Sequence, residues 1–109
     1  MSAEVIERRP GLRIQRQRLA PGEATPWHTD ACHRVTVVAS GERLRIEFAD
    51  GASPVEVDVR PGRVDRDAPE PRAHRAVNVG SCVYEEVVVF LLEPPGVEPQ
   101  PEAAGPASS

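Results

Sequence analysis

Hydrophobic and polar residues alternate with a period of two along much of the chain. The segments ERLRIEFAD (42–50) and SPVEVDVRPG (53–62) alternate apolar and charged residues, and stretches rich in β-branched residues occur at 33–40, 74–80 and 83–93. Alternation with this period is typical of strands that bury one face. No window of about twelve or more residues has the periodicity of an amphipathic helix. The sequence therefore predicts an all-β protein.

Turn signals separate these segments at regular intervals. They are Pro21-Gly22, Ser40-Gly41, Asp50-Gly51, Pro61-Gly62 and Gly80-Ser81. The Asp-Gly pair between two alternating segments predicts a tight hairpin that joins roughly 42–49 to 53–60. Short strands with such turns favour an antiparallel sandwich or barrel, and a jelly-roll closure would bring the strands of His28 and His74 together at one barrel mouth.

The length of 109 residues predicts a single domain. We assign the barrel to 13–92, an N-terminal arm or strand to 1–12, and a proline-rich disordered tail to 93–109. That last segment holds five of the twelve prolines and little that could be buried.

Composition narrows the range of partners and locations. All 13 basic residues are arginine, the formal net charge is −4, and no basic face stands out, so we expect no nucleic-acid partner. The first residues lack the apolar core of a signal peptide and no apolar run is long enough to span a bilayer, so we expect no membrane partner and a cytoplasmic location. The two cysteines, Cys32 and Cys82, are expected to be reduced thiols.

Two segments together resemble the cupin motifs. In PGEATPWHTDACHRVTVVASG (21–41), Gly22, His28, Asp30, Arg34 and Gly41 have the spacing of the glycine, His-x-His pair, glutamate and glycine of the first motif. In PGRVDRDAPEPRAHRAVN (61–78), the matching positions of the second motif are Gly62, Pro69, Pro71, His74 and Asn78. The resemblance implies the cupin fold, an antiparallel double-stranded β-helix, and a homodimer.

The resemblance also implies a divalent metal site. Carried over by position, the family's ligands become His28, Asp30, Arg34 and His74; the two histidines match, whereas Asp30 replaces a histidine and Arg34 replaces a glutamate. We expect His28, Asp30 and His74 as metal ligands, with Fe, Mn, Zn or Ni as candidate ions. This His-x-Asp…His set is also similar to that of Fe(II) oxygenases that share the fold, which we keep as a minor reading.

Strand geometry agrees with that assignment. In one continuous strand, residues 28, 30, 32 and 34 would share a face that points inward, with His33 outward. Two histidines and a carboxylate form the facial triad that suits non-haem iron.

Arg34 leaves two alternatives open. A dication about 5 Å from its guanidinium would be opposed by roughly 6–7 kcal/mol at an effective dielectric constant near 20. Arg34 could pair with Asp30 and take the carboxylate that a metal needs, or it could leave Asp30 free and orient an anionic ligand. Two further candidates for ligand binding are Trp27, the only tryptophan, and Glu86, if its side of the last strand faces the cavity.

The sequence therefore predicts a small cupin that binds or processes a small, anionic molecule in the barrel pocket, with a metal on His28, His74 and Asp30. Whether it is an enzyme stays open. The alternatives are a metal-free ligand-binding or sensor module in which Arg34 pairs with Asp30, and a pocket with purely structural duties.

Overall fold

A computed structural model describes residues 1–92, which form nine strands and no helix. The strands are β1 (Ser2–Arg9), β2 (Leu12–Leu19), β3 (His28–Asp30), β4 (His33–Ser40), β5 (Arg43–Phe48), β6 (Val55–Asp58), β7 (Val64–Asp67), β8 (Glu70–Asn78) and β9 (Tyr84–Leu91). Within these residues no helix is long and apolar enough to cross a membrane. The segment 93–109, with the predicted proline-rich tail, lies outside the described residues.

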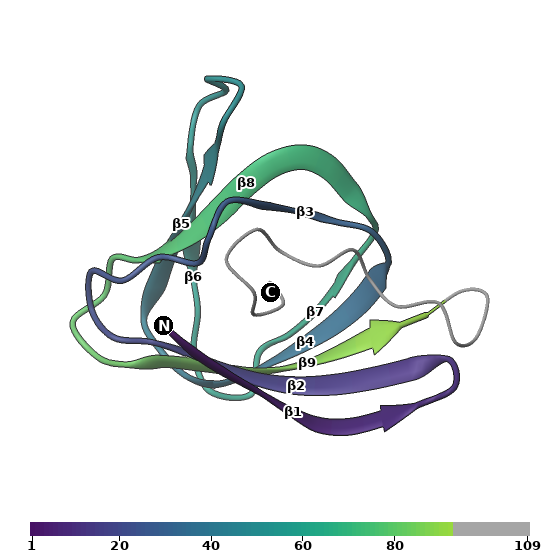
Figure 1. Ribbon diagram of the computed structural model, residues 1–109. Helices are drawn as coiled ribbons and strands as arrows, with labels where there is room; N and C mark the ends of the chain where they lie inside the picture. Colours follow the sequence, from purple (N-terminus) through teal and green to yellow (C-terminus); the bar gives the residue numbers. More distant parts are fainter. Residues whose placement is uncertain (93–109) are drawn as a thin grey trace.

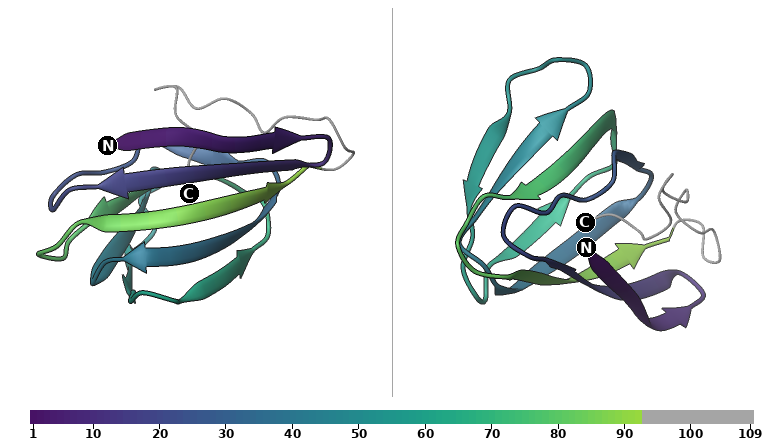
Figure 2. Two further views of the ribbon diagram at one scale, coloured as in Figure 1. Left: turned by 90° about the horizontal axis from the view of Figure 1, so that it is seen from below. Right: turned by 60° about the vertical axis from the view of Figure 1, so that its left-hand side comes forward.

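The strands form two antiparallel sheets that face each other around a common interior (Figures 1 and 2). One sheet has the order β1-β2-β9-β4-β7 and the other β3-β8-β5-β6. The predicted hairpin is confirmed, because β5 pairs with β6 from Arg43↔Asp58 to Ile46↔Val55. The strands of the two expected histidines also meet, with His28 directly opposite His74. The all-β, antiparallel prediction is therefore confirmed.

The core lies between the two sheets, where the alternating residues of both inner faces meet. One buried cluster consists of Leu19, Val38, Leu44, Val59, Ala76 and Tyr84, and a second of Val88, Phe90 and Leu92. On β9 the buried positions are every second residue from Tyr84 to Phe90, as the period-two pattern predicts.

The expectation of one continuous strand over 28–34 is wrong. β3 ends at Asp30 and β4 begins at His33, and the two strands belong to different sheets. The chain bends at Ala31 and Cys32 to pass from one sheet to the other. Because both sheets line the same interior, Asp30 and Arg34 still converge, while His33 is exposed as expected. Cys32 packs against the second core cluster.

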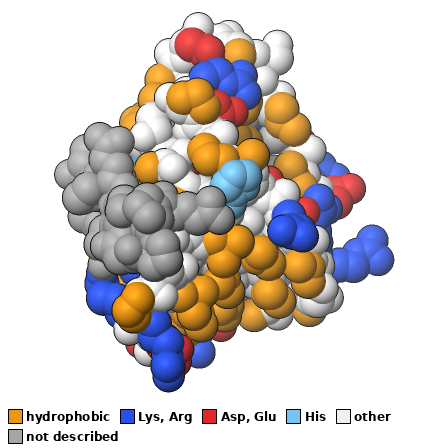
Figure 3. Space-filling model, turned by 90° about the vertical axis from the view of Figure 1, so that its right-hand side faces the viewer, with side chains coloured by type: hydrophobic (Ala, Val, Ile, Leu, Met, Phe, Trp, Pro, Cys, Tyr) orange, Lys and Arg blue, Asp and Glu red, His pale blue; other side chains and the backbone are white. Residues whose placement is uncertain are grey.

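The edge strand β1 and the exposed residues of the larger sheet are relevant to the predicted homodimer. Strand β1 pairs only with β2 among the described strands, so it forms one edge of the larger sheet. On the other side of that sheet's centre, Val37 and Val64 face each other across β4 and β7 and are 38% and 58% exposed. Figure 3 shows hydrophobic side chains gathered in one area of the face that it draws. The homodimer stays a prediction, with this larger sheet as a surface that could carry it.

Candidate metal and ligand site

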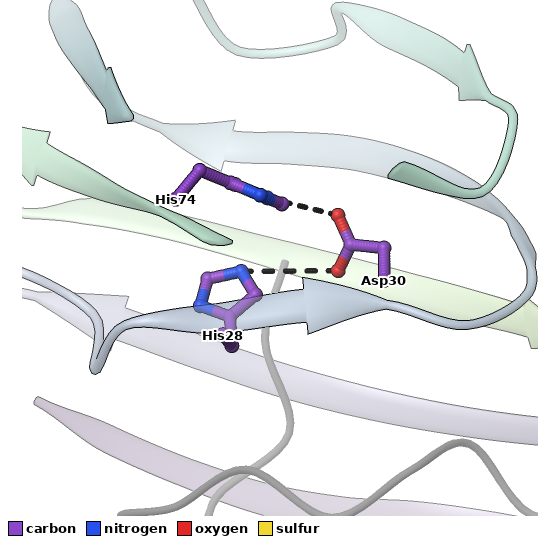
Figure 4. Close-up of side chains that lie close together, drawn as sticks. All are labelled: His28, Asp30 and His74. Atoms are coloured by element: carbon purple, nitrogen blue, oxygen red, sulfur yellow. Dashed lines mark ion pairs between the residues drawn. The ribbon is translucent and has the colours of Figure 1, made fainter. Parts of the chain in front are cut away.

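Strand pairing brings His28 and His74 together. The two residues are direct partners across β3 and β8, and their ring centroids lie 4.4 Å apart. Asp30, two residues along β3, points to the same place (Figure 4). All three side chains are buried, and each offers one ligand atom such that these atoms lie within 4.8 Å of one another. The two sequence motifs therefore meet in one cluster.

Backbone carbonyls fix the orientation of both imidazole rings. Nδ1 of His28 lies 2.6 Å from the carbonyl oxygen of Pro26, and Nδ1 of His74 lies 2.8 Å from that of Arg72. A carbonyl can only accept a hydrogen bond, so each Nδ1 carries a proton and donates it. Nε2 of each ring then faces Asp30, which is the arrangement that metal-binding histidines use.

Asp30 sits at the centre of the cluster and has cationic contacts on its other side. Its Oδ2 lies 3.0 Å from Nε2 of His74, and its Oδ1 lies 3.8 Å from Nε2 of His28. Nη1 of Arg34 forms an ion pair with the same Oδ2, and Nη2 of Arg34 lies 3.7 Å from Oδ2 of Asp67. Arg34 therefore pairs with Asp30 in this structure, which is the first of the two alternatives for this residue.

The two histidines have opposite pKa shifts. Burial lowers the pKa of His28, and its hydrogen bond to Pro26 and the charge of Asp30 offset this only in part. Burial also lowers the pKa of His74, but the hydrogen bond with Asp30, the bond to the Arg72 carbonyl and the charge of Asp30 outweigh it, so the pKa is raised. Protonation in the metal-free site therefore favours His74, where the proton bridges Nε2 to the carboxylate.

This difference predicts a pH-dependent effect of His74→Gln in chelator-treated protein. A raised folded-state pKa contributes stability that is complete below the ordinary value of 6.5 and is lost as the pH rises through the folded value. The variant should therefore lose more unfolding free energy, relative to the unmodified protein, at pH 5.5–6 than at about pH 8–8.5. Urea titrations at several pH values measure it. His33→Gln, at an exposed position, is the control for the exchange of an imidazole for an amide; a loss in His74→Gln that grows with pH would contradict the assignment.

The residues present fit a divalent cation on their donor chemistry. Nε2 of His28 is buried and has no hydrogen-bond partner among the described residues. Two imidazoles and a carboxylate are a common ligand set for Zn²⁺ and Fe²⁺. Metal–ligand bonds of about 2.1 Å place adjacent ligand atoms about 3 Å apart, so small shifts would complete the set. Arg34 opposes the ion electrostatically and competes for Asp30.

A cavity of about 460 Å³ adjoins the cluster and includes Asp30 and His74 in its lining. Its walls differ in character. The smaller sheet and the segment after β6 contribute most of the apolar side chains together with the charged or polar Asp30, Glu70 and His74, and the larger sheet contributes mainly polar ones. The apolar residues include Leu44, Ile46, Phe48, Val57 and Val59; the polar ones include Arg34, Thr36, Asp65, Asp67 and Glu86. The cavity can therefore hold a small molecule with one apolar and one polar side.

The two other residues expected to bind a ligand, Glu86 and Trp27, lie in different surroundings. Glu86 lines the cavity, is 1% exposed, and accepts hydrogen bonds from Tyr84 Oη and from Gln17 Nε2, the latter at 2.6 Å. Trp27 is 41% exposed, lies outside the cavity lining, and stacks on the guanidinium of Arg75 at 4.6 Å from the ring centroid. A role in ligand binding stays a prediction for both residues. The position of Glu86 in the cavity lining favours such a role for Glu86.

Sequence reasoning missed Asp67 and Tyr84 as site residues. Asp67 ends β7 directly opposite Arg34 on β4. The pattern RVDRDAPEP (63–71) carries no alternation of apolar and polar residues that would have indicated a strand. Tyr84 could have been found, because it shares the buried face of β9 with Glu86.

Comparisons with known proteins identify the fold. No family model and no curated protein matches the sequence. Among solved structures, a cupin domain from Bordetella pertussis Tohama I superposes with a TM-score of 0.73 at 21% identity, over 84% of this chain and 92% of that one. A double-stranded β-helix protein from Klebsiella pneumoniae subsp. pneumoniae MGH 78578 gives 0.67 at 18% identity, over 91% and 81%.

An enzyme is also among the similar structures. An oxalate oxidase in complex with the substrate analogue glycolate has a TM-score of 0.57 and 26% identity, over 79% of this chain and 44% of that one. The chain is therefore a small cupin-fold protein.

Proposed function

We propose that the protein binds a small molecule in the cavity beside a divalent metal held by His28, His74 and Asp30. The observation that carries this proposal is the convergence of both Nε2 atoms on one buried carboxylate, with each ring fixed from behind by a backbone carbonyl. The candidate ions are Fe, Mn, Zn and Ni. When bound, such an ion would supply Lewis-acid chemistry or, for a redox-active metal, oxygen chemistry.

The lining charges bear on the class of ligand. The lining contains five acidic residues and two arginines. Both arginines are in ion pairs with lining carboxylates, Arg34 with Asp30 and Arg63 with Asp65. This excess of negative charge, which a bound dication would reduce but not reverse, weighs against the anionic ligand expected from the sequence. We propose a neutral molecule that donates hydrogen bonds to the polar wall and packs its apolar side on Ile46 and Phe48.

A second candidate function is metal-free ligand binding. The observation that favours it is the ion pair of Arg34 with Asp30, which gives the buried carboxylate a cationic partner without any metal. In this function the same cavity binds the same class of molecule, with Asp30 and His74 in its lining. The two candidates differ in one measurable property, the metal content.

Elemental analysis of the untagged native protein tests the proposal. We expect near-stoichiometric Fe, Mn, Zn or Ni, either as purified or after incubation with the ion and removal of excess. His28→Ala and His74→Ala should each lower the content at least about tenfold, because a set with two ligands binds far more weakly than one with three. His33→Ala is the matched control, since this third histidine is exposed, and it should retain the metal.

Two results would contradict the metal site. Protein that stays metal-free after incubation with all four ions would favour the second candidate, to be followed by thermal-shift screening of neutral and charged small molecules. Metal that persists in His28→Ala and His74→Ala but disappears in His33→Ala would place the ion elsewhere on the surface.

A further inference from the structure

Resting on the proposed metal site, we propose that Arg34 is its built-in counter-cation and that Asp67 is the residue that receives Arg34 when a metal binds. Without metal, the guanidinium neutralises Asp30. With metal, the ion takes over Asp30 and Arg34 moves to a full ion pair with Asp67. The site thus exchanges one cation for another, and Asp67 is a positioning residue for the loaded state.

The position of Arg34 between two carboxylates supports this exchange. Nη1 contacts Asp30, and Nη2 already lies 3.7 Å from Oδ2 of Asp67. Arg34 and Asp67 are direct cross-strand partners on β4 and β7, so the second carboxylate is held in reach by the sheet itself. A small rotation of the side chain would exchange one contact for the other, with no movement of the backbone.

The burial of the two acids gives the exchange its direction. The side chain of Asp30 is 2% exposed, and a buried carboxylate of this kind requires a cation or several donors. The side chain of Asp67 is 46% exposed, so it is solvated in either state. Arg34 cannot lose its proton, and it must therefore leave the vicinity of a bound dication. The half-exposed Asp67 gives it a partner nearer to water.

The exchange would also change the cavity. Arg34, Asp30 and Asp67 all contribute to its lining. Movement of the guanidinium toward Asp67 would uncover the metal side of Asp30 and place the positive charge nearer to the loop after β7. Metal loading and the shape of the ligand cavity would thus be linked through one side chain.

Isothermal titration calorimetry of Zn²⁺ into chelator-treated, dialysed protein tests the exchange. Arg34→Gln should bind Zn²⁺ roughly 30–100-fold more tightly than the unmodified protein, because the competing cation is gone. Asp67→Asn should bind it roughly 5–10-fold more weakly, because displaced Arg34 loses its acceptor. In the Arg34→Gln background, Asp67→Asn should change the affinity less than about twofold, which is the coupling expected of a shared interaction.

Arg63→Gln is the matched control. It removes a positive charge from the same cavity lining, but its partner is Asp65, which is not part of the ligand group. It should change the Zn²⁺ affinity by less than about threefold, and this separates local competition from a general effect of charge. Because Asp67 is half exposed, we expect Asp67→Asn to fold. If Arg34→Gln does not fold, the weaker Zn²⁺ binding expected of Asp67→Asn still tests the exchange.

The outcomes separate the exchange from the metal site. Zn²⁺ binding that is unchanged or weakened in Arg34→Gln, or an Asp67→Asn effect of equal size in both backgrounds, would overturn the exchange and leave the metal site in place. Absence of Zn²⁺ binding at millimolar concentration in both the unmodified protein and Arg34→Gln would overturn the metal site and the exchange together.

Discussion

Gly41→Ala should lower the free energy of unfolding by about 3–5 kcal/mol, which is a large share of the stability of a domain of this size. Gly41 has φ of +142°, a conformation that residues with a side chain rarely adopt. A Cβ built there would lie 2.8 Å from Cδ1 of Tyr84 and 3.2 Å from Cγ2 of Val59. The backbone strain and the steric overlap therefore add, and neither neighbour can move without disturbing the core.

The effect should extend from Gly41 to the cavity. Tyr84 donates its hydroxyl hydrogen to Glu86, and both line the cavity, so displacement of the ring would disturb the buried carboxylate. Gly51→Ala is the control. It also has a positive φ, of +84°, but its added Cβ meets nothing within 4 Å. It should cost only about 1 kcal/mol. Urea unfolding of both variants measures the difference, and similar losses would show that the contact with Tyr84 is unimportant.

The fold was predictable because its determinants are local. The alternation around Leu44 and Ile46 and the Asp50-Gly51 turn predict a hairpin without knowledge of any distant contact, and that hairpin forms. The meeting of His28 and His74 was predictable from a jelly-roll closure and from the resemblance to the cupin motifs, but from no local pattern, since the two positions lie far apart in the sequence.

The site was less predictable because it depends on how strands of different sheets are aligned. Arg34 faces Asp67 through the register of β4 and β7, and no pattern in either segment encodes that register. Trp27 was a candidate for ligand binding, and its side chain is exposed and stacks with Arg75; its role in ligand binding stays a prediction.

Asn78, a position of the second motif, holds parts of the chain together through the hydrogen bonds of its side chain. Its side chain is fully buried and joins three segments. Nδ2 donates to the carbonyl oxygens of Leu19 at 3.0 Å and of Cys82 at 2.9 Å, and Oδ1 accepts from the backbone N–H of Gly80 at 3.0 Å. One amide, at the end of the strand that carries His74, thus ties the end of β2 to the turn between β8 and β9.

Asn78→Ala should therefore lower the free energy of unfolding by about 3–4 kcal/mol, because it removes three hydrogen bonds and leaves a small void. Asn78→Asp should cost more at neutral pH, since a carboxylate would face two carbonyl oxygens, and less at about pH 4, where a protonated acid can donate to one of them. Ser40→Ala, which removes a single bond to the Val83 carbonyl at an exposed site, should cost less than about 1 kcal/mol.

Thermal and urea unfolding of the three variants test this role. For Asn78→Ala we expect a melting temperature about 12–20 °C below that of the unmodified protein. A loss no greater than that of Ser40→Ala would show that solvent replaces the amide, and an Asn78→Asp variant that is most stable at neutral pH would show that the site accepts a charge. Because β8 places His74 opposite His28, metal affinity should fall in Asn78→Ala only under conditions where the variant begins to unfold.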